Sequence, residues 1–284
     1  MSDRLAVLPQ YLLPKQALTQ LMGKLAGLEG GSATTAVIRW FIQRYKVNMS
    51  EALEADPAAY KSFNQFFTRP LRPGVRPLAD ADWVCPVDGA ISQLGRITGA
   101  AGDQIFQAKG HHYSTQALVG GDAALAAQFA HGHFATIYLS PRDYHRIHMP
   151  CAGRLLRMIY VPGDLFSVNP TTARSVPGLF ARNERVVCVF EGEFGPFVLV
   201  LVGATIVGSM ATVWHGVVNP PRPGTLRDWD YQAQNIHLHR GDEMGRFLLG
   251  STVVLLMPQG DLHFTADWQA TRPVRLGEAM AQQG

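Results

Sequence analysis

The sequence has few cysteines, few charges and no excess of charge of either sign. Its three cysteines, Cys85, Cys151 and Cys188, are odd in number and widely spaced, which excludes a disulfide framework and a CxxC metal pair and predicts reduced thiols. Charged residues make up 17% of the 284 residues, and the formal net charge of +3 does not indicate a nucleic-acid-binding protein. With 47% hydrophobic residues, the chain is too apolar to be disordered.

The sequence also lacks a segment typical of a transmembrane helix. The apolar stretch 197–214 contains glycine, serine and threonine, so we expect two buried strands that meet at a turn or bulge. The apolar N-terminus is interrupted by Pro9 and Pro14, and no small-residue cleavage site follows. A signal peptide is therefore not expected.

Residues 1–68 are predicted to form short amphipathic helices, the first of them after Pro14. Its apolar stripe recurs at three- and four-residue steps and consists of Leu18, Leu21, Leu25 and Leu28. Ser32 is expected to cap a second helix, and Asp56 followed by Pro57 is expected to open a third helix that ends near Phe67. These helices carry most of the basic excess of the chain.

Residues 69–284 are predicted to form a β-rich domain. The sequence TRPLRPGVRPL predicts an extended connector at Arg69, because proline disfavours helix at and before its own position. Short β-rich segments separated by Gly, Pro and Asp follow it, at 90–97, 134–139, 155–161, 185–190, 197–202, 204–214 and 247–257. This pattern predicts an α+β, mainly β fold with a barrel or sandwich. Residues 217–240 are expected to form a long surface excursion.

Three segments carry the residue types that activate a hydroxyl group. They contain Asp88 before a glycine, His145 and His148 within SPRDYHRIHMP, and Ser251 after Gly250. A serine nucleophile, a histidine base and an aspartate that holds the imidazole tautomer form a catalytic triad. Each motif alone is weak, since Asp-Gly is common in turns and Gly-Ser within a strand is common at bulges. The absence of a G-x-S-x-G elbow disfavours an α/β-hydrolase.

The chain resembles the phosphatidylserine decarboxylases of the bacterial membrane-associated, pyruvoyl-dependent, self-processing type. The resemblance extends over nearly the whole chain. The matching segments are FNQFFTRPL (63–71), DG (88–89), SPRDYHRIHMP (140–150), YVPGDLFSVN (160–169), LFARNER (179–185), VGATIVG (202–208) and EMGRFLLGST (243–252). Many ordered matches make this resemblance specific, whereas LGST alone would not.

The resemblance implies autocatalytic cleavage between Gly250 and Ser251. The Ser251 hydroxyl attacks the Gly250 carbonyl, His148 takes its proton, and Asp88 orients His148. Elimination and hydrolysis then leave a pyruvoyl group in place of Ser251. This covalent cofactor forms an imine with the substrate amine and accepts the electrons that CO₂ leaves behind. His145 is assigned to reprotonate the product, with His148 as the alternative.

The resemblance further implies a substrate, a location and an assembly. Phosphatidylserine would be converted to phosphatidylethanolamine by a peripheral protein on the cytoplasmic side of the bacterial inner membrane. The mature protein would be a heterodimer of a β chain (1–250) and an α chain (251–284), with further dimerisation left open. No nucleic acid and no metal are expected. A weak candidate metal group, without convincing carboxylate or cysteine partners, is His111, His112, His131 and His133.

The N-terminal helices are expected to meet an anionic membrane surface. The side chains assigned to this contact are Leu12, Lys15, Leu18, Leu21, Met22 and Leu25. The alternative is that the same face packs against the β-rich domain or a second subunit. Three other functions compete: a serine hydrolase that does not cleave itself, a lipid-binding module that needs neither Ser251 nor His148, and a soluble pyruvoyl decarboxylase of free amino acids.

Overall fold

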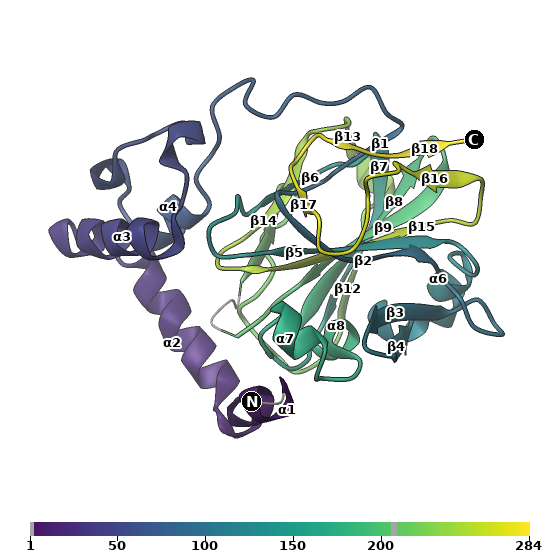
Figure 1. The fold of residues 1–284 in the computed structure, drawn as a ribbon, viewed down its shortest axis with the longest axis horizontal. Coiled ribbons are helices and arrows are strands. Elements are labelled where there is room, and N and C mark those ends of the chain that lie inside the picture. Colours follow the sequence, from purple (N-terminus) through teal and green to yellow (C-terminus); the bar gives the residue numbers. More distant parts are fainter. Residues whose placement is uncertain (1–2, 206–208) are drawn as a thin grey trace.

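The structure, a computed structural model, describes residues 3–205 and 209–284. A helical arm at the N-terminus leads into a body built mainly of strands (Figure 1). The helices of the arm are α1 (Asp3–Leu12), α2 (Lys15–Gly27), α3 (Ser32–Tyr45), the 3-10 helices η1 (Met49–Glu51) and η2 (Pro57–Ala59), and α4 (Phe63–Phe67).

Two helix boundaries in the arm differ from those predicted. Ser32 is the first residue of α3 and does not cap it, since Gly31 occupies the cap position with φ of 56°. Asp56 does cap a helix, because its carboxylate accepts a hydrogen bond from the Ala58 amide (2.9 Å). That helix is only the single turn η2. A separate helix, α4, begins after Ser62, whose extended backbone and side-chain cap interrupt the predicted 56–67 helix.

The largest sheet of the body is antiparallel, with the order β12-β7-β8-β9-β15-β5-β2-β17 and with β13 also pairing with β7. Its strands are β2 (Gly89–Arg96), β5 (His133–Leu139), β7 (Gly153–Val161), β8 (Arg185–Gly192), β9 (Gly195–Val202), β12 (Arg227–Asp230), β13 (His237–Leu238), β15 (Ser251–Met257) and β17 (Pro273–Val274). The strand β15 lies in the interior of this sheet, between β9 and β5.

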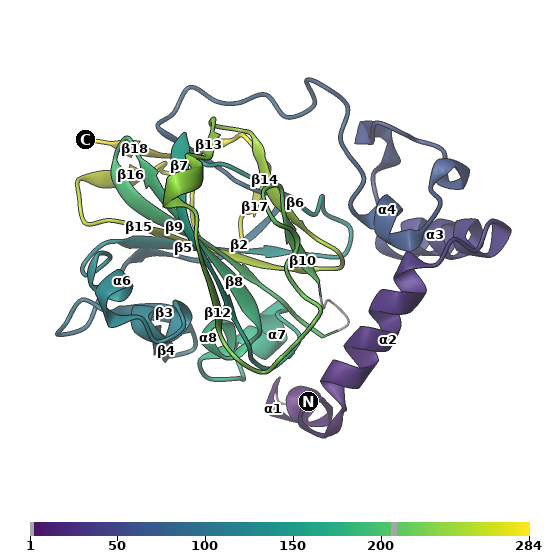
Figure 2. The same ribbon diagram turned by 180° about the vertical axis from the view of Figure 1, so that it is seen from behind.

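Both faces of the large sheet are buried. Along β15, Val254 and Leu256 enter one apolar cluster, while Val253 and Leu255 enter the other, as the two-residue period of a strand requires. Burial on both faces explains why β9 and β15 have nearly continuous apolar sequences rather than an alternating pattern. Short helices and a hairpin cover one face, and smaller sheets cover the other (Figures 1 and 2).

The covering elements are short. On one face lie β3 (Gln104–Ala108), β4 (His111–Ser114), α5 (Thr115–Leu118), α6 (Ala123–Ala127), α7 (Pro170–Ala173) and α8 (Leu179–Arg182). A four-stranded sheet consists of β11 (Gly216–Val217), β10 (Met210–Thr212), β14 (Glu243–Phe247) and β6 (Arg146–His148). A three-stranded sheet consists of β1 (Trp83–Val84), β18 (Ala279–Gln283) and β16 (Leu262–Phe264), and η3 covers Gln232–Gln234.

The predicted class, α+β and mainly β behind N-terminal helices, is confirmed, and none of the described sheets closes into a barrel. The predicted strand 247–257 is wrong, because the chain leaves one sheet at Phe247 and enters another at Ser251. The predicted strand 204–214 reduces to β10, and its residues 206–208 lie outside the described part. The segment 217–240 is more structured than expected, since β12 forms an edge of the large sheet and Tyr231 is buried.

Candidate active site

The Gly250–Ser251 bond lies where the chain crosses from the four-stranded sheet to the large sheet. Ser251 is the first residue of β15 and is paired with Leu139, the last residue of β5. On the other side of β5, the strand β2 begins directly after Asp88. Because neighbouring strands are antiparallel, the start of β15, the end of β5 and the start of β2 meet at one end of the sheet. Two of the three predicted triad positions are therefore brought to the same edge.

The Ser251 side chain is fully buried, at 0% exposure, and its hydroxyl has no hydrogen-bond partner among the described residues. The hydroxyl of the neighbouring Thr252 is in the same state. Leaving a buried hydroxyl unpaired costs about 1–3 kcal/mol. The fold therefore leaves the bonding capacity of the Ser251 hydroxyl unused.

His148 is held by two hydrogen bonds at the end of β6. Its Nδ1 lies 2.8 Å from the Gly241 carbonyl, and its Nε2 lies 3.0 Å from the Tyr144 hydroxyl. A carbonyl only accepts, so Nδ1 carries the proton and Nε2 accepts from Tyr144. Burial lowers the pKa of His148 below its ordinary value. The imidazole is therefore a neutral base with its lone pair at Nε2.

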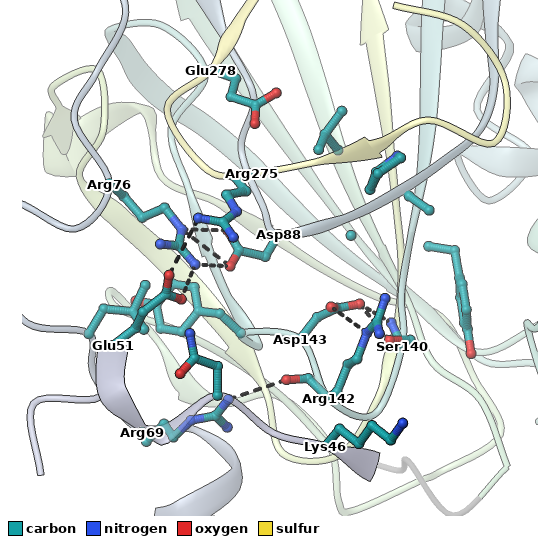
Figure 3. A pocket seen from close by; sticks show the side chains of 18 of the residues that line it. Lys46, Glu51, Arg69, Arg76, Asp88, Ser140, Arg142, Asp143, Arg275 and Glu278 are labelled. Atoms are coloured by element: carbon teal, nitrogen blue, oxygen red, sulfur yellow. Dashed lines mark hydrogen bonds and ion pairs between the residues drawn. The ribbon is translucent and has the colours of Figure 1, made fainter. Parts of the chain in front are cut away.

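Asp88 is joined to an arginine and not to a histidine (Figure 3). Its carboxylate accepts hydrogen bonds from Arg76 Nη2 at 2.6 Å and from the Leu276 amide at 2.9 Å, and Arg76 also bridges to Glu51 at 2.8 Å. The expected hydrogen bond between Asp88 and His148 is not formed in this uncleaved chain. Here the Gly241 carbonyl orients the imidazole, and Asp88 acts on it only through its charge.

His145 is fully buried and has one free ring nitrogen. Its Nδ1 donates to the Asp143 carbonyl at 2.8 Å, the ring lies 4.1 Å from that of Phe67, and Nε2 has no partner among the described residues. Burial, with a smaller contribution from the nearby charge of Arg69, lowers the pKa of His145 to about 3. His145 is thus neutral near pH 7, with an unused lone pair at Nε2.

A cavity of about 630 Å³ opens beside this end of the sheet. Figure 3 shows charged side chains from the arm and from the body converging on it. Its charged lining residues are Lys46, Glu51, Arg69, Arg76, Asp88, Arg142, Asp143, Arg275 and Glu278. Tyr138 and Ala90, which also line it, lie in one row across the sheet with Thr252. The cavity therefore reaches to within one strand of β15.

Several residues of this region were missed by the sequence analysis. Phe67 and Arg69 lie at and just after the end of α4. The sequence analysis placed Phe67 at the end of a helix and Arg69 at the start of a connector, although both lie in the matched segment FNQFFTRPL. The Arg146 side chain bonds the Thr68 carbonyl at 2.8 Å and ties this segment to β6. Tyr144 directly precedes His145 in the matched segment SPRDYHRIHMP, and its hydroxyl bonds His148. The arm thus supplies one wall of the site.

The arm also docks on the body at its other end, which changes the interpretation of Lys15. Gln10 of α1 bonds Thr172 Oγ1 at 3.1 Å, and Lys15 Nζ lies 4.0 Å from the centre of the Phe166 ring while donating to the Gln10 carbonyl. Lys15 is half-buried in these contacts. It therefore supports the docking alternative and does not point away as a membrane-facing cation.

The remaining side chains of the predicted membrane face divide into two groups. Leu12 is 89% exposed, and Leu21 and Leu25 are also exposed, whereas Leu18 and Met22 are half-buried. The exposed leucines form an apolar surface that the described part of the chain does not cover. None of the helices within residues 3–205 and 209–284 has the length and apolar content needed to cross a bilayer.

The histidines considered as a metal site are not gathered into one. His111 and His112 lie on β4, and His133 begins β5. Within the described ranges, no group of three or more His, Cys, Asp or Glu side chains is placed to hold a metal ion.

Comparison with known proteins identifies the family. Residues 63–282 match the family model described as phosphatidylserine decarboxylase, and residues 5–46 match one described as PSD. The phosphatidylserine decarboxylase proenzyme of Azoarcus sp. (strain BH72) is 74% identical over 280 residues, covering 99% of this chain and 96% of its own. The proenzyme of Variovorax paradoxus (strain S110) is 75% identical over 281 residues, covering 99% and 98%. The chain therefore belongs to the phosphatidylserine decarboxylase family.

Proposed function

We propose that this protein decarboxylates phosphatidylserine to phosphatidylethanolamine after cleaving its own chain between Gly250 and Ser251. Relatives that are more than 70% identical over the full chain and are named proenzymes support this function. The observation that carries the proposal is the Ser251 hydroxyl, which is fully buried and unpaired at the first residue of an interior strand. This hydroxyl is therefore not engaged by the fold and adjoins the Gly250 carbonyl along the chain.

The proposed cleavage uses only atoms of the chain and water. Ser251 Oγ attacks the Gly250 carbonyl carbon, the Gly250–Ser251 C–N bond breaks, and an ester forms with a free amine at residue 251. Loss of the α-proton and cleavage of the Cβ–Oγ bond release the Gly250 carboxylate and leave a dehydroalanine. Its imine tautomer adds water and loses ammonia, which leaves the pyruvoyl group on residues 251–284. Good orientation of the attacking atom supplies about 7–11 kcal/mol of such a barrier.

His148 is the proposed base for the first step. Its neutral imidazole and its Nε2 lone pair suit it to accept the Ser251 proton once the Tyr144 hydroxyl turns away. The negative charge of Asp88 favours the protonated form of His148. This electrostatic effect gives Asp88 its proposed role, in place of a direct hydrogen bond.

His145 is the proposed proton carrier in decarboxylation. The pyruvoyl group supplies an electron sink for the electrons that departing CO₂ leaves. The free Nε2 of His145 is the atom that would hold the proton destined for the substrate α-carbon. A substrate carboxylate near this ring favours protonation of Nε2, because an opposite charge stabilises the imidazolium.

The 34-residue α chain (251–284) is proposed to stay bound without a covalent link. Seven residues of β15 pair with β5 and five pair with β9, so the small chain supplies an interior strand of the large sheet. Its later strands β17 and β18 pair with β2 and β1 of the large chain. Removing it would expose both apolar clusters to water.

The proposal is tested with Ser251→Ala and with Thr252→Val as the matched control. Both variants remove a buried, unpaired hydroxyl, and only one removes the nucleophile. On a denaturing gel we expect wild type and Thr252→Val to run as two chains and Ser251→Ala to remain one. We also expect ¹⁴CO₂ release from carboxyl-labelled phosphatidylserine by the first two proteins only. An uncleaved wild-type protein with full activity contradicts the proposal.

We further propose that the exposed leucines of α1 and α2 contact the membrane, on the cytoplasmic side of the inner membrane. Leu12, Leu21 and Leu25 are uncovered in the described structure, and Lys24 is an exposed cation on the same helix. Replacing Leu21 and Leu25 by Gln should lower co-sedimentation with anionic liposomes about tenfold or more, because each leucine contributes about 1.5 kcal/mol or more when buried. Lys24→Gln should lower it about fivefold. Unchanged binding favours a protein partner for this face.

A further inference from the structure

Arg69 is a buried guanidinium that the protein leaves mostly unpaired. Its side chain is 3% exposed. Nη2 donates to the Arg142 carbonyl at 3.3 Å, whereas Nε and Nη1 have no hydrogen-bond partner among the described residues. Burial lowers the pKa of Arg69 below its ordinary value. A buried cation without a partner destabilises the fold unless an anion joins it.

Other buried arginines of the chain are paired. Arg76 bridges Asp88 and Glu51 at 2.6 and 2.8 Å. Arg185 donates from each of its three nitrogens to backbone carbonyls at 2.6–2.8 Å. Arg222 also has one unpaired nitrogen, Nη2, but its Nε pairs with Glu184 at 2.9 Å. Arg69 differs from these three arginines because two of its nitrogens are unused.

Arg69 lines the cavity beside the cleavage site, and Figure 3 shows its guanidinium on the same side as Lys46 and Arg142. Its unpaired Nε and Nη1 are enclosed within this wall of the cavity. The carboxylates of Asp88 and Glu51 are already paired with Arg76. The carboxylate of Asp143, which also acts on Arg69, accepts a hydrogen bond from the Ser140 hydroxyl at 2.7 Å and lies 3.8 Å from Arg142 Nε. Arg69 also acts electrostatically on His145, which places it close to the proposed proton carrier. This side of the cavity is therefore suited to an anionic group of a bound ligand.

We propose that Arg69 binds the phosphodiester of the phospholipid headgroup; this inference rests on the proposed function. The headgroup has two anionic groups, the phosphodiester and the carboxylate. The carboxylate becomes neutral CO₂ during the reaction, so an arginine bound to it stabilises the ground state more than the transition state and slows the reaction. The phosphodiester keeps its charge throughout. Arg69 is thus a binding residue that holds substrate and product alike.

The first test compares Arg69→Gln with Arg44→Gln. Arg44 is an exposed arginine of α3 whose guanidinium lies 5.4 Å from a tyrosine ring, much as that of Arg69 lies 5.3 Å from Phe66. With dihexanoyl phosphatidylserine as a monomeric substrate, Arg69→Gln should raise KM about tenfold or more and leave kcat within about threefold. It should raise the inhibition constant of dihexanoyl phosphatidylethanolamine by the same factor. Arg44→Gln should change neither constant.

The second test needs neither cleavage nor turnover. Binding of dihexanoyl phosphatidylethanolamine is titrated by NMR with the uncleaved Ser251→Ala protein, with and without Arg69→Gln or Arg69→Lys. We expect affinity to fall about tenfold with Gln and less with Lys, which keeps the charge without the planar fork. If binding depends on Arg69 but the wild-type protein releases no CO₂, the proposed function is refuted and the assignment of Arg69 stands.

Two results overturn the Arg69 assignment. If Arg69→Gln weakens phosphatidylserine and leaves phosphatidylethanolamine binding unchanged, Arg69 contacts the carboxylate. If both ligands bind the Ser251→Ala protein equally well with and without Arg69, the residue has a structural role only.

Discussion

Two groups of buried polar side chains near the same end of the large sheet are bonded differently; Arg185 and Thr252 both pair with Val202 there. In the group beside α5, α7 and α8, the buried amides and the buried guanidinium are bonded. Gln107 donates to two carbonyls at 2.7 and 2.8 Å and accepts from the Leu179 amide. Asn183 bonds Phe166 and Gly203, and Arg185 bonds three carbonyls. These side chains replace backbone pairing where the chain is irregular.

In the group at the start of β15, several buried polar atoms are left unpaired. The Ser251 and Thr252 hydroxyls, Nε2 of His145 and two nitrogens of Arg69 have no partner within the described residues. Unpaired hydroxyls also occur near the first group, at Tyr113 and Ser175, so the distinguishing feature is that several unpaired groups gather at the start of β15. An unpaired buried group lowers stability, and a gathering of such groups marks a candidate site of chemistry. The following predictions test this distinction.

The largest expected effects come from the two histidines. His148→Ala should leave the chain largely uncleaved, since removing a general base slows such a step about 10²–10⁴-fold. His145→Ala should be cleaved and should release no CO₂. Denaturing gels and the ¹⁴CO₂ assay report the two steps separately. The reverse pattern would exchange the roles of the two residues.

The next effect is on stability. Arg185→Met should lower the free energy of unfolding by roughly 3 kcal/mol, because three carbonyls lose a charged donor. Arg69→Met should cost less than about 1 kcal/mol, because it removes a buried charge with one weak bond. Urea unfolding measures both, in the uncleaved Ser251→Ala background, which keeps the protein a single chain. Equal losses would remove the distinction between the two groups of buried side chains.

The smallest effect is a pH dependence of stability that arises from His145. Its pKa is about 3 in the folded chain and about 6.5 when unfolded. The unfolded state therefore binds one more proton between these values, and stability falls as pH falls below about 6.5. The slope approaches 1.4 kcal/mol per pH unit at about pH 5. The measurement is urea unfolding of the Ser251→Ala protein between pH 7.5 and 5, with and without His145→Gln. Adding His145→Gln should remove this pH dependence of the free energy of unfolding. An unchanged slope would show that the ring is not buried as a neutral group.

Much of the architecture was predictable because it follows from local pattern. Continuous apolar runs identified the interior strands, and leucine spacing identified α2. The break between Phe247 and Ser251 was not predictable from hydropathy, since the chain stays apolar while it changes sheets. The strand-like sequence there concealed a crossing that depends on tertiary pairing.

The chemistry of the site was predictable only where motifs carried it. Asp88, His148 and Ser251 were identified from the family resemblance, and their assigned roles stay predictions. The hydrogen-bond partners of these residues could not be predicted, because they are set by long-range packing. The Gly241 carbonyl that bonds His148 is distant in the chain, and the Arg76 that bonds Asp88 comes from the connector. Lys15 misled for the same reason, because helical periodicity does not show what lies opposite a helix face.

The most direct test is the intact mass of the wild-type protein after denaturation, before and after treatment with a hydrazine reagent. The account predicts two chains, 1–250 and 251–284, the smaller one beginning with a pyruvoyl group that forms a hydrazone, and loss of activity on its reduction by borohydride. An active protein of one unbroken chain that does not react with hydrazine would contradict it.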